Sequence, residues 1–312
     1  MPPRITVVGS LNTDLVIRTP HLPSVGETVT GGEFATFPGG KGANQAVAAA
    51  RLGARVAMVG CVGGDDFGRR LADGLRRDGI DVTHVRVEAE SASGTALITV
   101  DPQGQNTIVV APGANWRLTP EDVARAEAII AESSILLLQL EVPMDAVLAA
   151  ARLAHARGVR VVLDPAPVPR QPLPVELYRL IDILNPNEGE AAALAAVKVT
   201  DEGAAGIAAE HLLRKGARAA VIKLGARGAF VHDGKRAEMV PGIRVDAVDT
   251  TAAGDAFAGA LAVGLAEGKD LIDAVHFATT AGALSVTRHG AQPSMPFRAE
   301  VDAFAQAQRT VP

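Results

Sequence analysis

The sequence predicts an α/β protein with a doubly wound, mostly parallel sheet flanked by helices, and a small β-sheet lid. Three observations lead to this prediction. From residue 119 onward, helical segments alternate regularly with short strands, which is typical of a parallel sheet. Strands such as ILLLQL and VRVVL are apolar throughout, as strands covered on both faces are. Two other stretches are strand-like and show no helical period.

The body begins with the β-branched strand RITVVGS, and continues with the helix KGANQAVAAARLGA, the strand RVAMVGCVGG and the helix DDFGRRLADGLRRDGI. Four helix and strand pairs follow. They are TPEDVARAEAIIAES with SILLLQLE, PMDAVLAAARLAHARG with VRVVLDPAP, PVELYRLI with DILNPNE, and EGAAGIAAEHLLRKGA with AAVIKLGARG. A chain of 312 residues with 48% hydrophobic residues can bury the core that such a sheet requires.

The lid is predicted from two separate stretches, about residues 12–38 and 92–112, which are alike in pattern. The runs GTALITVD and NTIVVAPGA flank DPQGQ and predict a hairpin, with Gly104 available for a positive φ in the turn. We expect the two stretches to pair into a small antiparallel sheet that projects from the body as a lid. In the alternative arrangement they extend the main sheet.

Composition excludes several classes of partner. A net charge of −5, no long basic run and only 3% aromatic residues argue against nucleic acid. No window approaches the roughly 20 apolar residues of a membrane span, and the N-terminus lacks the apolar core of a signal peptide. The one cysteine, Cys61, cannot form an internal disulfide. We therefore expect a cytoplasmic protein with small-molecule ligands.

Polar residues follow several predicted strands, at the edge where open α/β sheets bind ligands. Asn12 and Asp14 follow the first strand, and Glu141 and Asp164 follow two later ones. The segments NPNEGE and LGARG stand at similar positions. Each residue alone has an alternative role as a turn former or cap. Together they predict a binding site at one edge of the sheet.

The loop FPGGKGAN predicts a site for a polar or anionic ligand. Gly39, Gly40 and Gly42 surround Lys41 directly before a helix, so that backbone, cation and helix N-terminus can approach a ligand together. The loop is not a Walker A motif, because glycine follows GK where Ser or Thr is required. No G-x-G-x-x-G follows the first strand, which argues against a dinucleotide site.

The segment VDTTAAGDAFAGAL opens a later helix. Thr251 to Gly254 would present unpaired backbone N–H groups, which suit the charge on a phosphoryl group in transfer. Asp255, in the first turn, would accept the proton of an attacking hydroxyl. In the alternative interpretation, Asp255 only caps the helix.

With GGKGANQAVAAARLG near residue 40 and DTTAAGDAFAGAL near residue 250, the sequence resembles the PfkB family of sugar kinases. The segments VVGSLNTDLV, PNEGEA and VTRHGAQPSMP are similar to the ribokinase group of that family, so the resemblance covers essentially the whole chain. It implies a single PfkB-type domain over residues 1–312, and ATP-dependent phosphorylation of D-ribose at O5 to give D-ribose 5-phosphate and ADP. It also implies a homodimer through the lid.

The resemblance implies a role for each matching residue. Asp255 would be the base, beside an anion hole of Ala252, Ala253 and Gly254. The sugar would be held by Asn12, Asp14, Gly40, Lys41, Asn44, Glu141 and Asp255. Magnesium (Mg2+), water and phosphates would be organised by Asn187 and Glu190. ATP would meet Lys223, Leu224, Gly225, Ala226, Arg227, Gly228, Gly254 and Thr279. A monovalent cation, usually potassium (K+), would be bound by Asp249, Thr251, Ser285, Arg288, Gly290 and Ser294.

Two positions depart from the wider family pattern. Position 252 is alanine where many relatives have glycine, an alanine that the ribokinase group shares. Thr279 stands where that group commonly has histidine or asparagine near the adenine, so nucleotide preference is open.

Other functions remain to be weighed. A PfkB kinase for deoxyribose, fructose, a nucleoside or a phosphorylated sugar is the nearest alternative. Asn12, Asp14 and Glu141 favour a small neutral polyol, because carboxylates would repel a second phosphate. A non-catalytic sugar-binding protein would have lost the base or the anion hole, whereas Asp255 is present. A nicotinamide-dependent oxidoreductase would need the missing glycine fingerprint.

Overall fold

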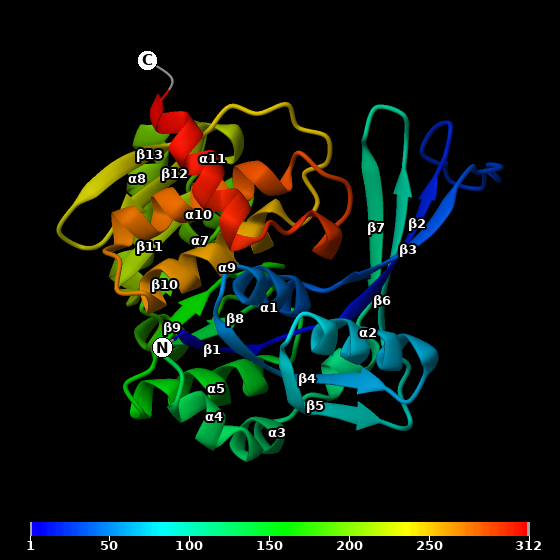
Figure 1. The fold of residues 1–312 in the computed structure, drawn as a ribbon, viewed down its shortest axis with the longest axis horizontal. Coiled ribbons are helices and arrows are strands. Elements are labelled where there is room, and N and C mark those ends of the chain that lie inside the picture. Colours follow the sequence, from blue (N-terminus) through cyan, green and yellow to red (C-terminus); the bar gives the residue numbers. More distant parts are fainter. Residues whose placement is uncertain (1, 311–312) are drawn as a thin grey trace.

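The computed structural model describes residues 2–310. The body of the protein is built on a nine-stranded sheet (Figure 1). Its strands are β1 (Arg4–Val8), β4 (Arg55–Gly63), β5 (Asp81–Glu88), β8 (Ile135–Leu138), β9 (Arg160–Leu163), β10 (Ile183–Leu184), β11 (Ala219–Lys223), β12 (Gly228–His232) and β13 (Ala237–Pro241). Their order in space is β13-β12-β11-β10-β9-β8-β1-β4-β5. Neighbours from β5 across to β11 pair in parallel, and β12 and β13 are antiparallel. The predicted fold class is confirmed.

Helices cover both faces of this sheet. One layer contains α1 (Lys41–Arg51), α2 (Asp66–Arg77), α9 (Ala253–Ala266), α10 (Leu271–Ser285) and α11 (Arg298–Thr310). The other contains α3 (Pro120–Arg125), α4 (Glu127–Ala131), α5 (Met144–Ala156), α6 (Val175–Leu180), α7 (Glu188–Ala195) and α8 (Glu202–Lys215). Because side chains alternate along a strand, Leu137 packs toward the first layer and Leu136 toward the second. This explains why the strand sequences are apolar throughout.

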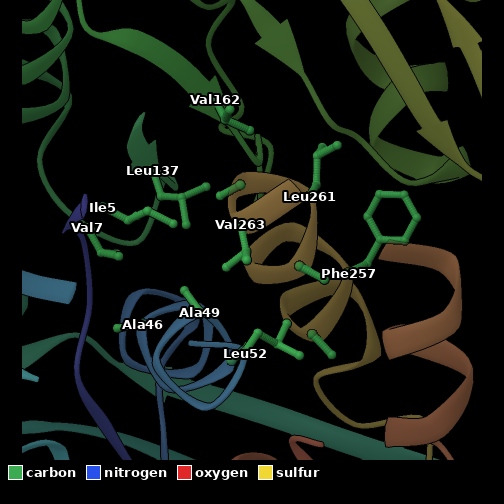
Figure 2. Packing of buried hydrophobic residues seen from close by; sticks show 14 of the residues in the cluster. Ile5, Val7, Ala46, Ala49, Leu52, Leu137, Val162, Phe257, Leu261 and Val263 are labelled. Atoms are coloured by element: carbon green, nitrogen blue, oxygen red, sulfur yellow. The ribbon is translucent and has the colours of Figure 1, made fainter. Parts of the chain in front are cut away.

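The contact between α1 and α9 brings two parts of the site together. Figure 2 shows both helices against apolar side chains of the sheet, including Ile5 and Leu137. A Cβ at Gly259 of α9 would lie 2.6 Å from the Cβ of Ala48 in α1, closer than two carbons can pack. Small residues therefore let the helices approach closely, and the N-terminal turns of both helices reach the same region.

The lid is a separate four-stranded sheet that projects from the body (Figure 1). Its strands are β2 (Asn12–Arg18), β3 (Phe34–Gly39), β6 (Gly94–Val100) and β7 (Asn106–Ala111), in the order β3-β2-β6-β7. The predicted hairpin joins β6 to β7 with Gly104 at φ 78°. The expectation of a wholly antiparallel sheet is wrong, because β2 pairs with β6 in parallel. Both strands start at the body and run outward, which fixes this direction.

Two local differences from the sequence prediction concern the body. The single helix predicted over TPEDVARAEAIIAES is divided into α3 and α4 at Ala126, whose N–H bonds three residues back to Val123. The hairpin of β12 and β13 is an addition to the predicted helix and strand alternation. Three short 3-10 helices complete the described elements, η1 (Gly113–Arg117), η2 (Gly225–Arg227) and η3 (Gln292–Ser294). Within residues 2–310, no helix has the length and apolar character needed to cross a bilayer.

Candidate active site

The loop before α1 lies where lid and body meet. A Cβ at Gly40 would lie 2.6 Å from the backbone nitrogen of Asn12, and the φ of Gly40 is 88°. Both facts require glycine at this position. A Cβ at Gly42 would lie equally close to the nitrogen of Ser10. Because these glycines have no side chain, the start of α1, including Lys41, can lie directly against the β1–β2 connection.

Asp255 is buried in the first turn of α9, with 4% of its surface exposed. Its Oδ2 accepts a hydrogen bond from Asn44 Nδ2 at 2.9 Å, and its Oδ1 accepts one from Gln45 Nε2 at 3.1 Å. The N-cap position is Ala252, in left-handed conformation and without a side-chain cap. Asp255 is therefore not a capping residue. Burial raises its pKa above the ordinary range, against the opposing effect of the Lys41 ammonium.

Lys41 supplies the positive charge among these acids. Burial lowers the pKa of its ammonium, but the carboxylates of Asp255, Asp164 and Glu141 together raise this pKa above the ordinary value. Lys41 therefore stays protonated throughout the physiological range. It lies between several carboxylates and can offset their mutual repulsion.

The other predicted sugar-binding residues lie at the same junction. The Lys41 N–H donates to Glu141 Oε2 at 3.0 Å, and Ser10 Oγ donates to the same oxygen. Asn12 and Asp14 come from the start of β2. Burial, with smaller contributions from Glu141 and Asp255, raises the pKa of Asp14 to about 7. The structure thus brings Asp14, Lys41, Asn44, Glu141 and Asp255 together around one acidic centre. The side-chain oxygen of Asn12 accepts a hydrogen bond from Asn115 Nδ2 at 2.7 Å.

A cleft of about 950 Å³ adjoins this centre on the body side. Lys41 and Asp255 belong to its wall, so they connect the two regions. The predicted nucleotide and phosphate residues in the wall are Asn187, Glu190, Lys223, Gly225, Ala226, Gly228, Ala252, Ala253, Gly254 and Thr279. Two of the predicted nucleotide-binding residues, Leu224 and Arg227, do not line the cleft. Leu224 is buried in the core, and the guanidinium of Arg227 pairs with Glu188.

The N-terminus of α9 offers fewer free donors than the sequence predicted. The Thr251 N–H donates to Asp249 Oδ1 at 2.9 Å, and the Ala253 N–H donates to the Thr250 carbonyl at 3.2 Å. These donors are used within the loop itself. In the described part of the chain, the N–H groups of Ala252 and Gly254 have no protein acceptor. Two donors, not four, are therefore available to an anion in the cleft.

Asn187 and Glu190 form a capping box at the start of α7. Asn187 Oδ1 accepts the Glu190 N–H at 2.9 Å, and Glu190 Oε2 accepts the Asn187 N–H at 2.8 Å. Burial raises the pKa of Glu190, while Lys223 opposes this effect. The pair has a structural role in the helix, and it also faces the cleft.

Asp249, in the loop before α9, contacts two of the other predicted cation-site residues, Thr251 and Gly290. Asp249 Oδ2 accepts the Gly290 N–H at 2.9 Å, so this carboxylate joins two loops. The hydroxyls of Ser285 and Ser294 donate to the nearby carbonyls of Gly282 and Ala291. The guanidinium of Arg288 is turned away and pairs with Glu300. The predicted role of Arg288 involves only its backbone carbonyl, and the ion pair with Glu300 does not use this carbonyl.

Sequence reasoning missed several residues of the site. Asp164 had been identified only as a polar residue at a strand end, yet its carboxylate accepts a bond from Lys223 Nζ at 2.7 Å in the cleft wall. The segment 242–247, after β13, also lines the cleft. Its sequence, GIRVDA, has no recognisable ligand-binding pattern. Gln45 gave no signal either, because an amide in an alanine-rich helix has many possible roles.

Comparison with known proteins agrees with this geometry. Residues 2–298 match the model of the pfkB family of carbohydrate kinases. The chain is 45% identical to the ribokinase of Haemophilus influenzae, over 97% of this chain and 98% of that one. It is 37% identical to a deoxyribokinase of Salmonella typhi, over 94% and 95%. The structure of Arabidopsis thaliana ribokinase complexed with ribose and ATP has a TM-score of 0.89 and 34% identity, over 97% and 99%. The chain therefore belongs to the PfkB family of carbohydrate kinases.

Proposed function

We propose that the protein transfers the γ-phosphoryl group of ATP to O5 of D-ribose, giving D-ribose 5-phosphate and ADP. Membership of the family makes it a phosphotransferase that acts on a sugar hydroxyl. The observation that carries the proposal is the position of Asp255. This buried carboxylate belongs to the wall of the cleft and contacts Asn44 of the predicted sugar-binding set.

Asp255 is proposed to accept the proton of the sugar hydroxyl while the new O–P bond forms. Each of its oxygens accepts one amide hydrogen bond, so each keeps a lone pair for the hydroxyl. The free N–H groups of Ala252 and Gly254 would bind the oxygens of the phosphoryl group. A Cβ at Gly254 would lie 3.5 Å from Lys223 Nζ, so a cation stands beside these donors. Positioning and charge supply most of the acceleration in phosphoryl transfer.

The sugar would be held by the side chains of Asn12, Asp14, Lys41, Asn44 and Glu141, with the backbone of Gly40. Carboxylate and amide oxygens accept hydroxyl hydrogens, and the ammonium of Lys41 donates. A site that pairs each hydroxyl in this way rejects analogues that lack one. The excess of carboxylates favours a neutral sugar over a phosphorylated one.

The residues present fit a magnesium ion (Mg2+) that is held mainly by ATP. Among residues 2–310, no group of three or more His, Cys, Asp or Glu side chains is placed to hold a metal ion. Mg2+ usually keeps several waters and uses one or two carboxylates with substrate phosphates. The Glu190 carboxylate, oriented by Asn187, fits such a role. When bound, the ion would neutralise charge on the phosphates.

The residues around Asp249 fit a potassium ion (K+), which we propose as an activator. Both oxygens of Asp249 accept backbone N–H groups, one from Thr251 and one from Gly290, and each keeps a lone pair. The remaining proposed ligands are oxygens of Thr251, Ser285, Arg288, Gly290 and Ser294. Hard oxygen donors of this kind suit an alkali cation. The role of these residues would be to hold the loop that carries Ala252.

Deoxyribose is the second acceptor to be considered, because the chain is also similar to a deoxyribokinase. The two sugars differ by a single hydroxyl. The site therefore favours a small neutral sugar as the acceptor class, and contacts to this one hydroxyl decide between ribose and deoxyribose.

A coupled assay of ADP release tests the proposal. Purified protein with ATP and Mg2+ is tested on ribose, deoxyribose, fructose and nucleosides, with K+ or Na+ as the salt. We expect ribose to give the highest kcat/KM, and K+ to give faster turnover than Na+. Asp255→Asn should retain ribose binding in calorimetry and lose about 10²-fold or more in kcat. No turnover on any sugar would support a non-catalytic binding protein and contradict the proposal.

A further inference from the structure

Gln45 forms a link between two carboxylates that belong to different parts of the site. It is completely buried in α1 and does not belong to the wall of the cleft. Its Nε2 donates one hydrogen to Asp255 Oδ1 at 3.1 Å and the other to Asp164 Oδ2 at 3.0 Å. One primary amide has two such hydrogens, so both are used.

The orientation of the Gln45 amide is fixed by a hydrogen bond from a second glutamine, Gln139. Gln139 Nε2 donates to Gln45 Oε1 at 2.6 Å, so the oxygen faces Gln139 and the nitrogen faces the two acids. A flipped amide would turn its oxygen toward two carboxylates and its nitrogen toward another donor. A Cβ at Gly9 would lie 2.0 Å from Gln139 Oε1, so glycine leaves the space that Gln139 occupies. Gln45 therefore has a single favourable orientation.

The second carboxylate leads to the phosphate side of the cleft. Asp164 has only 1% of its surface exposed, and its Oδ1 accepts a hydrogen bond from Lys223 Nζ at 2.7 Å. Lys223 Nζ in turn lies beside Gly254, near the free donors of α9. A continuous chain of contacts thus runs from Asp255 through Gln45 and Asp164 to Lys223.

We propose that Gln45 is a positioning residue that fixes the carboxylate of Asp255 relative to the Asp164–Lys223 pair. The proton acceptor and the cation beside the phosphate donors are then held in one geometry. Gln45 has no exposed surface, so it would act on the substrates only through other residues. The proposal rests on the proposed phosphotransfer to a sugar hydroxyl, and it adds a residue that acts through two others.

The link also has an electrostatic consequence. Without Gln45, Asp255 would keep one amide donor instead of two, and Asp164 would face Asp255 with no donor between them. Both changes favour the protonated form and raise the pKa of Asp255. The charged groups of this cluster, on α1, β2, α7, β11 and the ends of β8 and β9, are Lys41, Asp14, Glu190, Lys223, Glu141 and Asp164.

The test compares Gln45→Met, which keeps the size and removes both donors, with Gln45→Glu, which keeps the shape and adds a third acid. We measure kcat and the ribose KM from about pH 5 to pH 9, and ribose affinity by calorimetry. For Gln45→Met we expect kcat at neutral pH to fall about tenfold or more, and the acid limb of kcat to move about one unit higher. The ribose KM and affinity should change less than about threefold.

Thr6→Val is the matched control. It removes another buried hydrogen bond, between the hydroxyls of Thr6 in β1 and Ser133 at 2.8 Å, where β8 begins and away from the carboxyl ends of the strands. We expect it to lower the melting temperature without moving the pH profile. A Gln45→Met protein with the wild-type kcat and acid limb would overturn the inference.

The Gln45→Glu variant decides the question if Gln45→Met does not fold. Its acid limb should move upward as well, and an unmoved limb would contradict the proposal. An inactive wild-type protein would instead contradict the proposed function. The two failures are therefore distinguishable in the same experiment.

Discussion

At the scale of single residues, the site concentrates more negative charge than its one central lysine balances. Asp14, Glu141 and Asp255 lie around Lys41, and burial raises the pKa of both Asp14 and Asp255. A fold that only had to be stable would not place acids in this way. The repulsion among these acids makes the proposed sugar site electrostatically unfavourable, and hydroxyl groups of a polyol would reduce this repulsion by donating hydrogen bonds to the acids.

The substitution Asp14→Asn should stabilise the protein at high pH. The pKa of Asp14 is about 7 in the folded state against an ordinary 3.8, so folding penalises its charged form. The penalty is absent below pH 3.8, grows as the pH rises toward 7, and is complete above it. The full pKa shift corresponds to roughly 4 kcal/mol. We expect the free energy of unfolding at pH 8 to rise by about half of this or less, because burying the asparagine amide also has a cost.

Denaturant unfolding at several pH values checks this expectation. The advantage of Asp14→Asn should shrink steadily toward pH 4, and ribose affinity should fall because an acceptor is lost. A variant whose advantage is equal at pH 8 and pH 4 would exclude titration of Asp14 as the cause.

At the scale of elements, the start of α1 depends on the close contact between Gly40 and the backbone of Asn12. Gly40→Ala would combine a positive φ with an overlap at 2.6 Å. Gly53, just beyond the C-terminal end of α1, also has a positive φ, but a Cβ there would meet nothing within 4 Å. The two glycines form a matched pair that separates backbone strain from steric overlap.

We expect Gly53→Ala to lower stability by about 1 kcal/mol through backbone strain alone. Gly40→Ala should lower it more, and it should also raise the ribose KM several-fold because Asn12 and Lys41 must move. Thermal melting and steady-state kinetics of both variants give the comparison. Equal effects of the two substitutions on KM would show that the overlap at Gly40 has no influence on the site.

The elements that the sequence predicted well are those whose pattern depends on local chemistry. The apolar strands, the alanine-rich α1 and the hairpin at Gly104 have clear periodicity or turn residues. The parallel pairing of β2 with β6 has no local signal, because it depends on where two distant strands leave the body. The β12–β13 hairpin did have a signal, the Asp-Gly of HDGKR, where Gly234 adopts a φ of 84°.

At the scale of the whole molecule, the lid has an apolar outer face that we propose as the homodimer interface. Asp14 pairs with Ala96 across the lid, whereas Leu97 pairs with Leu15 and Val109. Because neighbours along a strand point to opposite faces, Leu97 and Val109 lie on the face away from Asp14. Both side chains are more than half exposed, at 55% and 66%.

The substitution Val109→Lys should therefore convert a dimer into a monomer, since a charge in an apolar interface is unfavourable. Val175→Lys is the control, because Val175 of α6 is similarly exposed at 62% but belongs to the body. Sedimentation velocity of the two variants and the wild type measures the assembly state. A wild-type monomer, or a Val109→Lys dimer, would contradict an interface on this face.

Much of the candidate site was predictable because glycines, Lys41 and Asp255 stand in sequence motifs that are read locally. The residues that were missed act through contacts between distant segments. Gln45 gains its importance from Asp164 and Gln139, which follow different strands. For the anion hole, the sequence predicted too many free donors, because the N–H groups of Thr251 and Ala253 form hydrogen bonds within the loop itself. Such competition is decided by loop conformation.

The strand β2 presents consecutive residues to two different neighbours. Asp14 faces the acidic centre of the proposed sugar site, and Leu15 faces the outer surface of the lid. A ligand and a second copy of the chain would therefore act on opposite sides of one ribbon of backbone. Thermodynamic linkage then requires reciprocity, so that if sugar tightens self-association, self-association must tighten sugar binding by the same factor. The apparent affinity for the acceptor would consequently depend on the concentration of the enzyme itself.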